Sequence, residues 1–534
     1  MKKNSLIKSF FFFFVILLIA VSSRAEPREL IILTTSDLHG QLEPFAAEKD
    51  NGTSNAGGIT RIASVVKTIK KLNKQKTVLF SSGDSLTGKY FLRFKGEAIF
   101  SAMSLLGIDS ATLGNHEFDR GVEALSNALK YCSFPIVESN LETIDNSSLK
   151  NSFERFKIIN RNGIKIGVIG LMTPDLSFIS NAGNNVAVDP DIAGSAVNMI
   201  RSLKQKESPD LIVALTHLGL EEDIKLAGQV PEIDLICGGH SHDLMEKEKE
   251  TVINHADGRK TIITHAGARG EYLGLLSMVV EKGNIISHLW EPIRVTSKIR
   301  QDKKALDLIT SYNKDLPEGK VLTILKKALD CRGETLRTRE AAAGNMIADI
   351  IREHFNVDVA FQNSGGIRGE RIIPPGNITT EDIDTMLPFE NQISILSLKG
   401  YEIKQILEQS VSFLPLEYGG FLQVSGLRFD VDTNKNSFKI KKDKTTGELK
   451  IINKGKRVSN IKILDPNRGY EPLISERSYK VAINSFLASG GDKYFIFKNQ
   501  KKMSTYITLR SIVENRLNSL SSLSLTKENR IRYR

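Results

Sequence analysis

The chain has 534 residues, of which 40% are hydrophobic and 25% are charged. These proportions are typical of soluble globular proteins and exclude a disordered chain, a collagen-like chain and a membrane protein with many spans. The length predicts two or more domains. The three cysteines, Cys132, Cys237 and Cys331, are too few for a disulfide scaffold or a thiolate metal cluster. A bound metal would therefore need nitrogen and oxygen ligands.

The first 25 residues have the order of a secretory signal peptide. Three lysines precede an apolar run over 10–21, and Ser23 and Ala25 supply the small residues of a cleavage site. This run is short for a membrane span. We therefore expect an exported protein (periplasmic, secreted or at the cell surface) that is cleaved after Ala25 and has no membrane span afterwards. An uncleaved N-terminal anchor is the alternative. The segment holds four of the positive charges behind the formal net charge of +11, so the remaining residues carry +7.

Strand-like and helical patterns alternate through the first half of the chain. Amphipathic helices are expected over 59–72 and around 97–106. The expected strands are 30–35, 77–80, 110–113, 164–169, 211–215, 233–236 and 261–264. Short β-branched runs separated by helix-length segments indicate a layered α/β domain, which we place at 27–296.

A second domain is expected over 320–520, after a connecting helix and linker at 297–319. The helix of the connection is expected over 298–312, before the stop signal Leu316-Pro317-Glu318-Gly319. The second domain opens with a helical pattern over 344–355 and continues in strands and hairpins. One exposed hairpin is expected over 438–452, around Thr446-Gly447. The polar segment 521–534 is expected to be a basic tail.

Metal-binding residue types follow the expected strands of the first domain. Because ligand crevices in open α/β sheets lie beyond the carboxyl ends of the strands, these side chains are expected to converge. They are Asp37, His39, Asp84, Asn115, His116, His217, His240 and His242. A set of this size suits two metals that share a carboxylate, and its donors fit Zn, Mn, Fe or Co. The other histidines are expected to be structural or at the surface, namely His255, His265, His288 and His354.

The ordered motifs D-x-H, G-D, G-N-H-E, T-H and G-H-x-H resemble the calcineurin-like metallophosphoesterase family. The longer strings T-S-D-L-H-G-Q-L-E at 35–43 and L-G-N-H-E-F-D-R-G at 113–121 are similar to its 5′-nucleotidase branch. The resemblance covers most of 29–515. It implies a four-layer α/β/β/α sandwich followed by an α+β substrate-binding domain. It also implies a phosphoric-ester hydrolase with two divalent metal ions.

The same resemblance implies roles for single residues. Asp84 would bridge the two ions, and His116 with Asp119 would form a catalytic pair in which Asp119 orients the imidazole. A helix-start cap is the alternative for Asp119. The resemblance assigns the other ligands as Asp37, His39 and His242 for one ion and Asn115, His217 and His240 for the other.

Three loops of the second domain resemble the substrate-binding loops of the nucleotidases. They are Gln362 to Arg368, Leu387 to Asn391 and Asn484 to Asp492. The resemblance implies that two phenylalanines sandwich the nucleobase, while polar side chains bind ribose, base edges and phosphate. The implied residues are Arg337, Asn363, Arg368, Phe389, Asn391, Phe486 and Asp492. Arg339 competes with Arg337 for its role. Ala341 stands where some relatives carry a further basic residue, which favours monophosphates over diphosphates.

We expect hydrolysis of nucleoside 5′-monophosphates to nucleoside and phosphate, by attack of a metal-bound hydroxide on phosphorus. Two alternatives use the same scaffold: a UDP-sugar hydrolase and a 2′,3′-cyclic-nucleotide phosphodiesterase. A more remote alternative is a non-catalytic nucleotide-binding surface protein. The lysines at 67–76 and 435–456 lack interleaved aromatic residues, so we expect solvated surfaces and no nucleic-acid partner. The sequence leaves the oligomeric state open.

Overall fold

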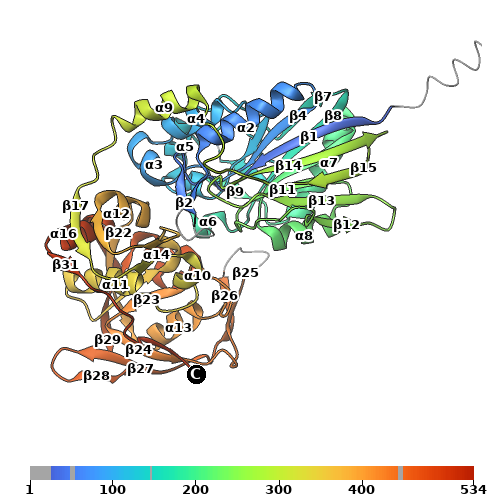
Figure 1. Cartoon of the computed structure of the whole chain (residues 1–534). Helices are drawn as coiled ribbons and strands as arrows, with labels where there is room; N and C mark the ends of the chain where they lie inside the picture. Colours follow the sequence, from blue (N-terminus) through green and yellow to red (C-terminus); the bar gives the residue numbers. More distant parts are fainter. Residues whose placement is uncertain (1–25, 48–53, 145–146, 184, 443–448) are drawn as a thin grey trace, which may run out of the picture.

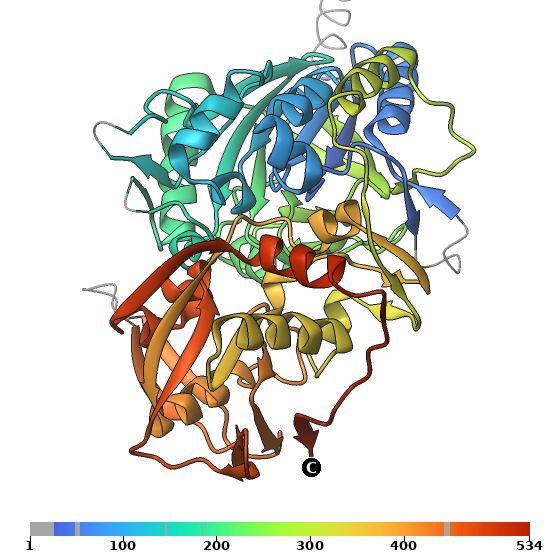
Figure 2. The ribbon, with the colours of Figure 1, turned by 90° about the vertical axis from the view of Figure 1, so that its left-hand side faces the viewer.

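The computed structural model describes residues 26–47, 54–144, 147–183, 185–442 and 449–534. The predicted signal peptide lies outside the described residues. Two regions lie one above the other in both views of the ribbon (Figures 1 and 2). They are joined by a segment that leaves α9 (Lys303–Asn313) and runs down one side to β17 (Val321–Leu325).

The first region contains two six-stranded sheets. One has the order β15-β14-β1-β4-β5 with β16 paired to β14, and the other has the order β12-β13-β11-β10-β8-β7. The strands of the first sheet are β1 (Arg28–Thr35), β4 (Thr77–Ser82), β5 (Ser110–Thr112), β14 (Tyr272–Glu281), β15 (Asn284–Trp290) and β16 (Ile293–Arg294). Those of the second are β7 (Phe156–Arg161), β8 (Ile164–Met172), β10 (Leu211–His217), β11 (Leu235–Gly238), β12 (Thr251–Asn254) and β13 (Lys260–His265).

The two sheets pack face to face with helices on both outer faces. Buried side chains of both sheets, such as Phe80 and Val213, share one apolar cluster. The first sheet is covered by α2 (Ile59–Leu72), α3 (Gly88–Phe94), α4 (Glu97–Ser104) and α5 (Gly121–Leu129). The second is covered by α7 (Ile192–Glu207) and α8 (Leu220–Gln229). The predicted four-layer α/β/β/α sandwich is confirmed, and α2 has the predicted bounds.

The connecting helix differs from the prediction over 298–312. It begins only at Lys303, because the Asp302 carboxylate caps it by accepting from the backbone N–H groups of Lys304 and Ala305 at 3.0 and 3.2 Å. Its Ala305 and Ile309 are buried in the apolar core of the first region. The helix therefore packs as part of the first region, and only about 314–320 spans the two.

The second region is built on a mixed five-stranded sheet with the order β23-β19-β29-β22-β30. Its strands are β19 (Val359–Asn363), β22 (Gln392–Lys399), β23 (Leu422–Ser425), β29 (Ser478–Asn484) and β30 (Lys502–Thr508). The longer helices of this region are α11 (Ala342–Phe355), α13 (Gly400–Ser410) and α16 (Leu509–Asn518). The expected hairpin is present as β25 (Phe438–Lys442) and β26 (Leu449–Lys454), and its expected turn at Thr446-Gly447 lies outside the described residues.

The C-terminal segment 521–534, which was expected to be a basic tail, packs on the second region. It forms β31 (Ser522–Leu523), which pairs with β17, and β32 (Ile531–Tyr533), which pairs with β24 (Leu427–Val431). Arg530 is only 4% exposed. Its backbone N–H donates to Glu340 at 2.6 Å, and its guanidinium binds Asp349 at 2.6 Å. These distant partners hold the polar segment in place, and such contacts produce no periodic pattern in the sequence from which they could be predicted.

The remaining short elements fill the connections between these layers. In the first region they are β2 (Phe45–Ala47), β3 (Ser54–Ala56), β6 (Leu141–Thr143), α6 (Leu176–Ile179) and β9 (Val186–Val188). In the second they are β18 (Leu329–Asp330), α10 (Gly333–Leu336), β20 (Ile372–Ile373), β21 (Gly376–Thr379), α12 (Thr380–Met386), β27 (Val458–Asp465), β28 (Gly469–Pro472), α14 (Ser485–Ala488) and α15 (Phe495–Lys498). None of the helices in the described part of the chain has the length and apolar character that a bilayer crossing requires.

Candidate metal centre and substrate pocket

The expected metal ligands meet at one edge of the sandwich. β1, β4 and β5 are parallel neighbours in one sheet, and β10 and β11 are parallel neighbours in the other. Their carboxyl ends open at the same side, as expected for parallel strands. The loops that follow bring together side chains that are up to about two hundred positions apart in the sequence.

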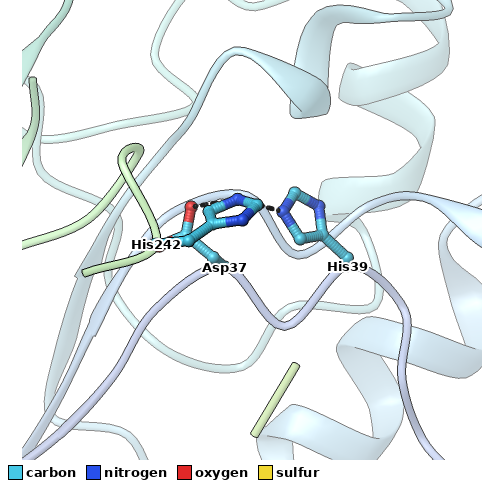
Figure 3. A group of neighbouring side chains, drawn as sticks. All are labelled: Asp37, His39 and His242. Carbon is cyan, nitrogen blue, oxygen red and sulfur yellow. Dashed lines mark hydrogen bonds and ion pairs between the residues drawn. The ribbon is translucent and has the colours of Figure 1, made fainter. Parts of the chain in front are cut away.

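One ligand group consists of Asp37, His39 and His242 (Figure 3). The Nε2 atoms of the two histidines lie 2.9 Å apart, and Nε2 of His242 lies 3.6 Å from Oδ1 of Asp37. Asp37 is fully buried, and its carboxylate also accepts from the backbone N–H of His240. Two imidazole nitrogens that face each other beside a buried carboxylate provide a binding site for a cation.

A second group surrounds Asp84. Nε2 of His217 lies 3.1 Å from Oδ2 of Asp84, 3.3 Å from Oδ1 of Asn115 and 3.2 Å from Nδ1 of His240. The Nδ1 atom of His217 lies 2.8 Å from the Ser82 carbonyl, a contact that turns Nε2 toward the other donors. Asp84 is also grouped with His39, so it lies between the two sets.

The backbone at these ligands is unusual. Five of the seven predicted ligands have positive φ angles of 48–82°, namely Asp37, His39, Asp84, His240 and His242. This conformation costs about 1 kcal/mol or more at each residue that is not glycine, and it gathers at functional sites. Carboxylates, imidazoles and an amide are donors that suit divalent cations. The strained backbone at these residues is a further sign of a functional site.

His116 lies beside both ligand groups. It begins the 3₁₀ turn η2 (His116–Phe118), which brings Nδ1 of His116 to 2.6 Å from Oδ2 of Asp119. Nε2 of His116 lies 3.8 Å from Oδ2 of Asp84 and 3.0 Å from Nη2 of Arg368. Burial disfavours the charged ring, but the carboxylates of Asp119 and Asp84 outweigh it and raise the pKa of His116 above its ordinary value.

A hollow of about 890 Å³ separates these residues from the second region and is lined from both sides. Asp84, Asn115, His116, His240 and His242 line it from the first region. All seven predicted substrate residues line it from the second, namely Arg337, Asn363, Arg368, Phe389, Asn391, Phe486 and Asp492. Arg339, the competitor of Arg337, does not belong to the lining.

Polar side chains of the second region form hydrogen bonds with one another beside the hollow. Nδ2 of Asn363 donates to Oδ2 of Asp492 at 2.8 Å, and Nδ2 of Asn484 donates to Oδ1 of Asn363 at 2.8 Å. Burial raises the pKa of the Asp492 carboxyl to about 6. The ring of Phe389, which also lines the hollow, stacks on His116 with 5.9 Å between centroids and 19° between planes.

Sequence reasoning missed Glu117, the residue after His116. Its side chain is 1% exposed and accepts three backbone hydrogen bonds. Oε2 accepts from Asp84 N–H at 3.0 Å and Gly114 N–H at 2.7 Å, and Oε1 accepts from Ser85 N–H at 2.6 Å. Glu117 thus ties together the loops that carry Asp84 and Asn115. The G-N-H-E motif was the available signal, but spacing alone does not reveal such a role.

The four remaining histidines lie outside the ligand groups found among the described residues. His265 and Asp223 form a buried pair, with 2.8 Å from Nε2 to Oδ2. The pair packs against Gly238, where an added Cβ would lie 2.2 Å from both side chains. Gly238 is therefore required to be glycine where β11 leads into His240. His255 contacts Thr261 and His288 contacts Glu250, each at 2.9 Å, and the ring of His354 contacts that of Phe355.

Comparisons with known proteins agree with this architecture. Residues 30–244 match the family model for calcineurin-like phosphoesterases, and residues 320–499 match the 5′-nucleotidase C-terminal domain. The chain is 31% identical to the 5′-nucleotidase of Bos taurus, over 89% of this chain and 86% of that one. It is 29% identical to a snake venom 5′-nucleotidase from Gloydius brevicauda, over 90% of this chain and 84% of that one. Among solved structures, the 5′-nucleotidase precursor of Thermus thermophilus matches with a TM-score of 0.85 and 30% identity, covering 95% of this chain and 99% of that one. The chain therefore belongs to the 5′-nucleotidase family and is a phosphoric-ester hydrolase.

Proposed function

We propose that this protein is an exported 5′-nucleotidase that uses two divalent ions to hydrolyse nucleoside 5′-monophosphates to a nucleoside and phosphate. The observation that carries the proposal is the shared hollow. One wall presents the candidate metal ligands with His116, and the other presents arginines, aromatic rings and a buried carboxylate. A nucleotide needs all of these in one place.

The two ligand groups suit two ions. We assign Asp84 as the bridge because it belongs to a group on either side. The other ligands are Asp37, His39 and His242 for one ion and Asn115, His217 and His240 for the other. Divalent ions held by these residues would supply a nucleophile from water at neutral pH and positive charge for the phosphoryl oxygens. Zn, Mn, Co and Fe all accept these donors.

His116 and Arg368 are assigned to the reacting phosphate. In its protonated form His116 carries a proton on Nε2, which faces the hollow, while Asp119 holds Nδ1. This proton can be donated to the 5′-oxygen as it leaves phosphorus. The guanidinium of Arg368, 3.0 Å from that nitrogen, offers donors to the phosphoryl oxygens.

The nucleoside is assigned to the second region. Phe389 and Phe486 would stack on the base, and Asp492 and Asn391 would accept or donate hydrogen bonds to ribose and base edges. Asn363 holds Asp492 at 2.8 Å and so fixes its carboxylate. Arg337 lies 3.8 Å from both Glu370 and Glu417, which compete with a second phosphate for its guanidinium. Ala341 and Ala343 are buried and add no phosphate contact. These features favour a monophosphate.

Export is the second part of the proposal. It rests on the signal-like residues 1–25 and on the similarity to a protein named for snake venom. Pulse labelling of the producing cells should show a precursor that shortens as the protein leaves the cytoplasm. A product that keeps its N-terminus inside the cell would refute export.

The activity is tested by phosphate release from the purified 26–534 chain with added Mn²⁺, Co²⁺ or Zn²⁺. The substrates are AMP, UMP, ADP, UDP-glucose and 2′,3′-cyclic AMP. We expect the highest kcat/KM for the monophosphates and none in the Asp84→Asn variant. A preference for UDP-glucose or the cyclic ester would refute the substrate assignment while keeping the metal site. Release from none of them would refute the catalytic function.

A further inference from the structure

A second hollow, of about 1160 Å³, lies on the first region at the edge opposite the metal centre. It is bounded by α2 and the residues after it, the 104–107 turn, the β7–β8 turn at 160–163, and the start of α9. β4 begins here with Thr77 and ends just before Asp84. Its six residues, at about 3.3 Å each, set the hollow roughly 20 Å from the metal ligands.

This hollow is strongly cationic. Six basic side chains line it, namely Lys67, Lys70, Lys71, Lys74, Arg161 and Lys304, and we call it the lysine hollow. Lys67 is paired with Asp302 at 2.9 Å, and Asp109 binds both Lys70 and Arg161.

The other three cations of the lysine hollow are exposed and uncompensated. Lys71, Lys74 and Lys304 have no carboxylate partner within the part of the chain that the structure describes. The lysine hollow therefore has a surplus of positive charge. Among the described residues, these lysines form no ion pair that could contribute to the stability of the fold.

Exposed leucines accompany these cations. Leu72 on α2 is 76% exposed, and Leu105 in the lining is 46% exposed. Free lysines beside exposed aliphatic side chains are the combination that binds the interface of an anionic bilayer. A single-stranded nucleic acid would be bound by aromatic rings that stack on its bases. None of the described residues that line the lysine hollow is aromatic.

The path of the chain supports the same orientation. Arg28, the first residue of β1, donates from its guanidinium to the carbonyl of Gly163 at the rim of the lysine hollow. Strand β1 therefore begins at this edge. The substrate pocket is lined by residues at the other end of the sandwich and by residues of the second region. Figure 1 shows the second region beyond that end. A membrane bound at this edge would leave the substrate pocket accessible to nucleotides.

We propose that the lysine hollow is a docking surface for the anionic headgroups of a phospholipid bilayer. Each lysine close to an anionic membrane strengthens binding about five-fold. Neutralising Lys71, Lys74 and Lys304 together should weaken binding by about 100-fold at low salt. Raising the salt to 0.5 M should also weaken the binding of the unmodified protein, because exposed charges are screened.

The test is cosedimentation of the Mn²⁺-loaded 26–534 protein with vesicles of phosphatidylcholine containing about one third phosphatidylglycerol. The variant is Lys71→Gln, Lys74→Gln, Lys304→Gln. A variant with the same change in net charge is Lys439→Gln, Lys441→Gln, Lys454→Gln, on the exposed strands β25 and β26. Both are expected to hydrolyse AMP at the unmodified rate, which shows that they are folded.

We expect only the lysine-hollow variant to lose vesicle binding. Equal loss in the two variants would refute the proposal, because net charge alone would then explain binding. Equal binding of the unmodified protein to vesicles of pure phosphatidylcholine, or no binding to either kind, would also refute it. Binding of a single-stranded oligonucleotide that depends on the same three lysines, without vesicle binding, would replace the membrane with a nucleic acid as the partner.

Discussion

Replacing Glu117 with glutamine tests how the metal ligands are held. The carboxylate accepts three backbone hydrogen bonds of 2.6–3.0 Å from the loops after β4 and β5. Hydrogen bonds to a charged group contribute about 1.5–3 kcal/mol each. The glutamine amide group would turn its own donors toward at least one backbone N–H and leave it unsatisfied. We therefore expect Glu117→Gln to lower the free energy of unfolding by roughly 2–4 kcal/mol.

The chain offers a clean assay for this prediction, because its single tryptophan, Trp290, is buried in the first region. Urea unfolding followed by its fluorescence reports on that region. The Mn²⁺ concentration for half-maximal AMP hydrolysis should also rise 10- to 100-fold, since Asp84 and Asn115 lose their common anchor. Glu221→Gln, on an exposed side chain, is the matched control and should change stability by less than 0.5 kcal/mol. Equal stability and equal Mn²⁺ dependence in the two variants would refute the argument.

Three further predictions concern the reaction. His116→Asn should lower kcat for AMP by about 10²- to 10⁴-fold, and by much less for p-nitrophenyl phosphate, whose leaving group needs no proton; equal losses would exclude a general acid. Phe486→Ala should raise KM for AMP about ten-fold or more with little change in kcat, since a stacked base is worth about 1–3 kcal/mol; an unchanged KM would remove Phe486 from the base site. EDTA should abolish phosphate release and Mn²⁺ should restore it, whereas activity that survives complete chelation would rule out the metal mechanism.

The sequence predicted the four layers of the first region and the edge of the sheets at which the candidate metal ligands lie. Buried β-branched runs indicate parallel strands. Because parallel strands end at the same edge of a sheet, the residues that follow them lie at that edge. Asp37 and His217 could therefore be placed close together from the sequence alone. Helix α2 could be bounded because its apolar positions repeat at helical spacing.

What the sequence did not predict depends on partners that are distant and not periodic. Glu117 acts through backbone groups of two loops, and Arg530 is held by Asp349 and Glu340, which lie 181 and 190 positions earlier. The ion pairs that join the two regions could not be predicted for the same reason, because their partners are far apart in the sequence. They include Lys89 with Glu381 at 2.5 Å and Lys493 with Asp175 at 2.6 Å. Charged residues of this sort look like ordinary surface positions until the fold brings them together.

The contact between His116 and Arg368 favours the binding of an anion in the hollow. In the protonated form of His116, two donors on positive groups face each other at 3.0 Å; His116 is buried and Arg368 is half-buried. That arrangement is unfavourable alone, because neither donor can satisfy the other and the charges repel. An oxygen with negative charge placed between them would accept from both and remove the repulsion. Asp119, at 2.6 Å from Nδ1 of His116, orients the imidazole and favours its charged form, because its carboxylate raises the pKa of His116. Under the proposed function, donors preset in this way would stabilise the negative charge of a phosphoryl group without having to reorganise when the substrate binds.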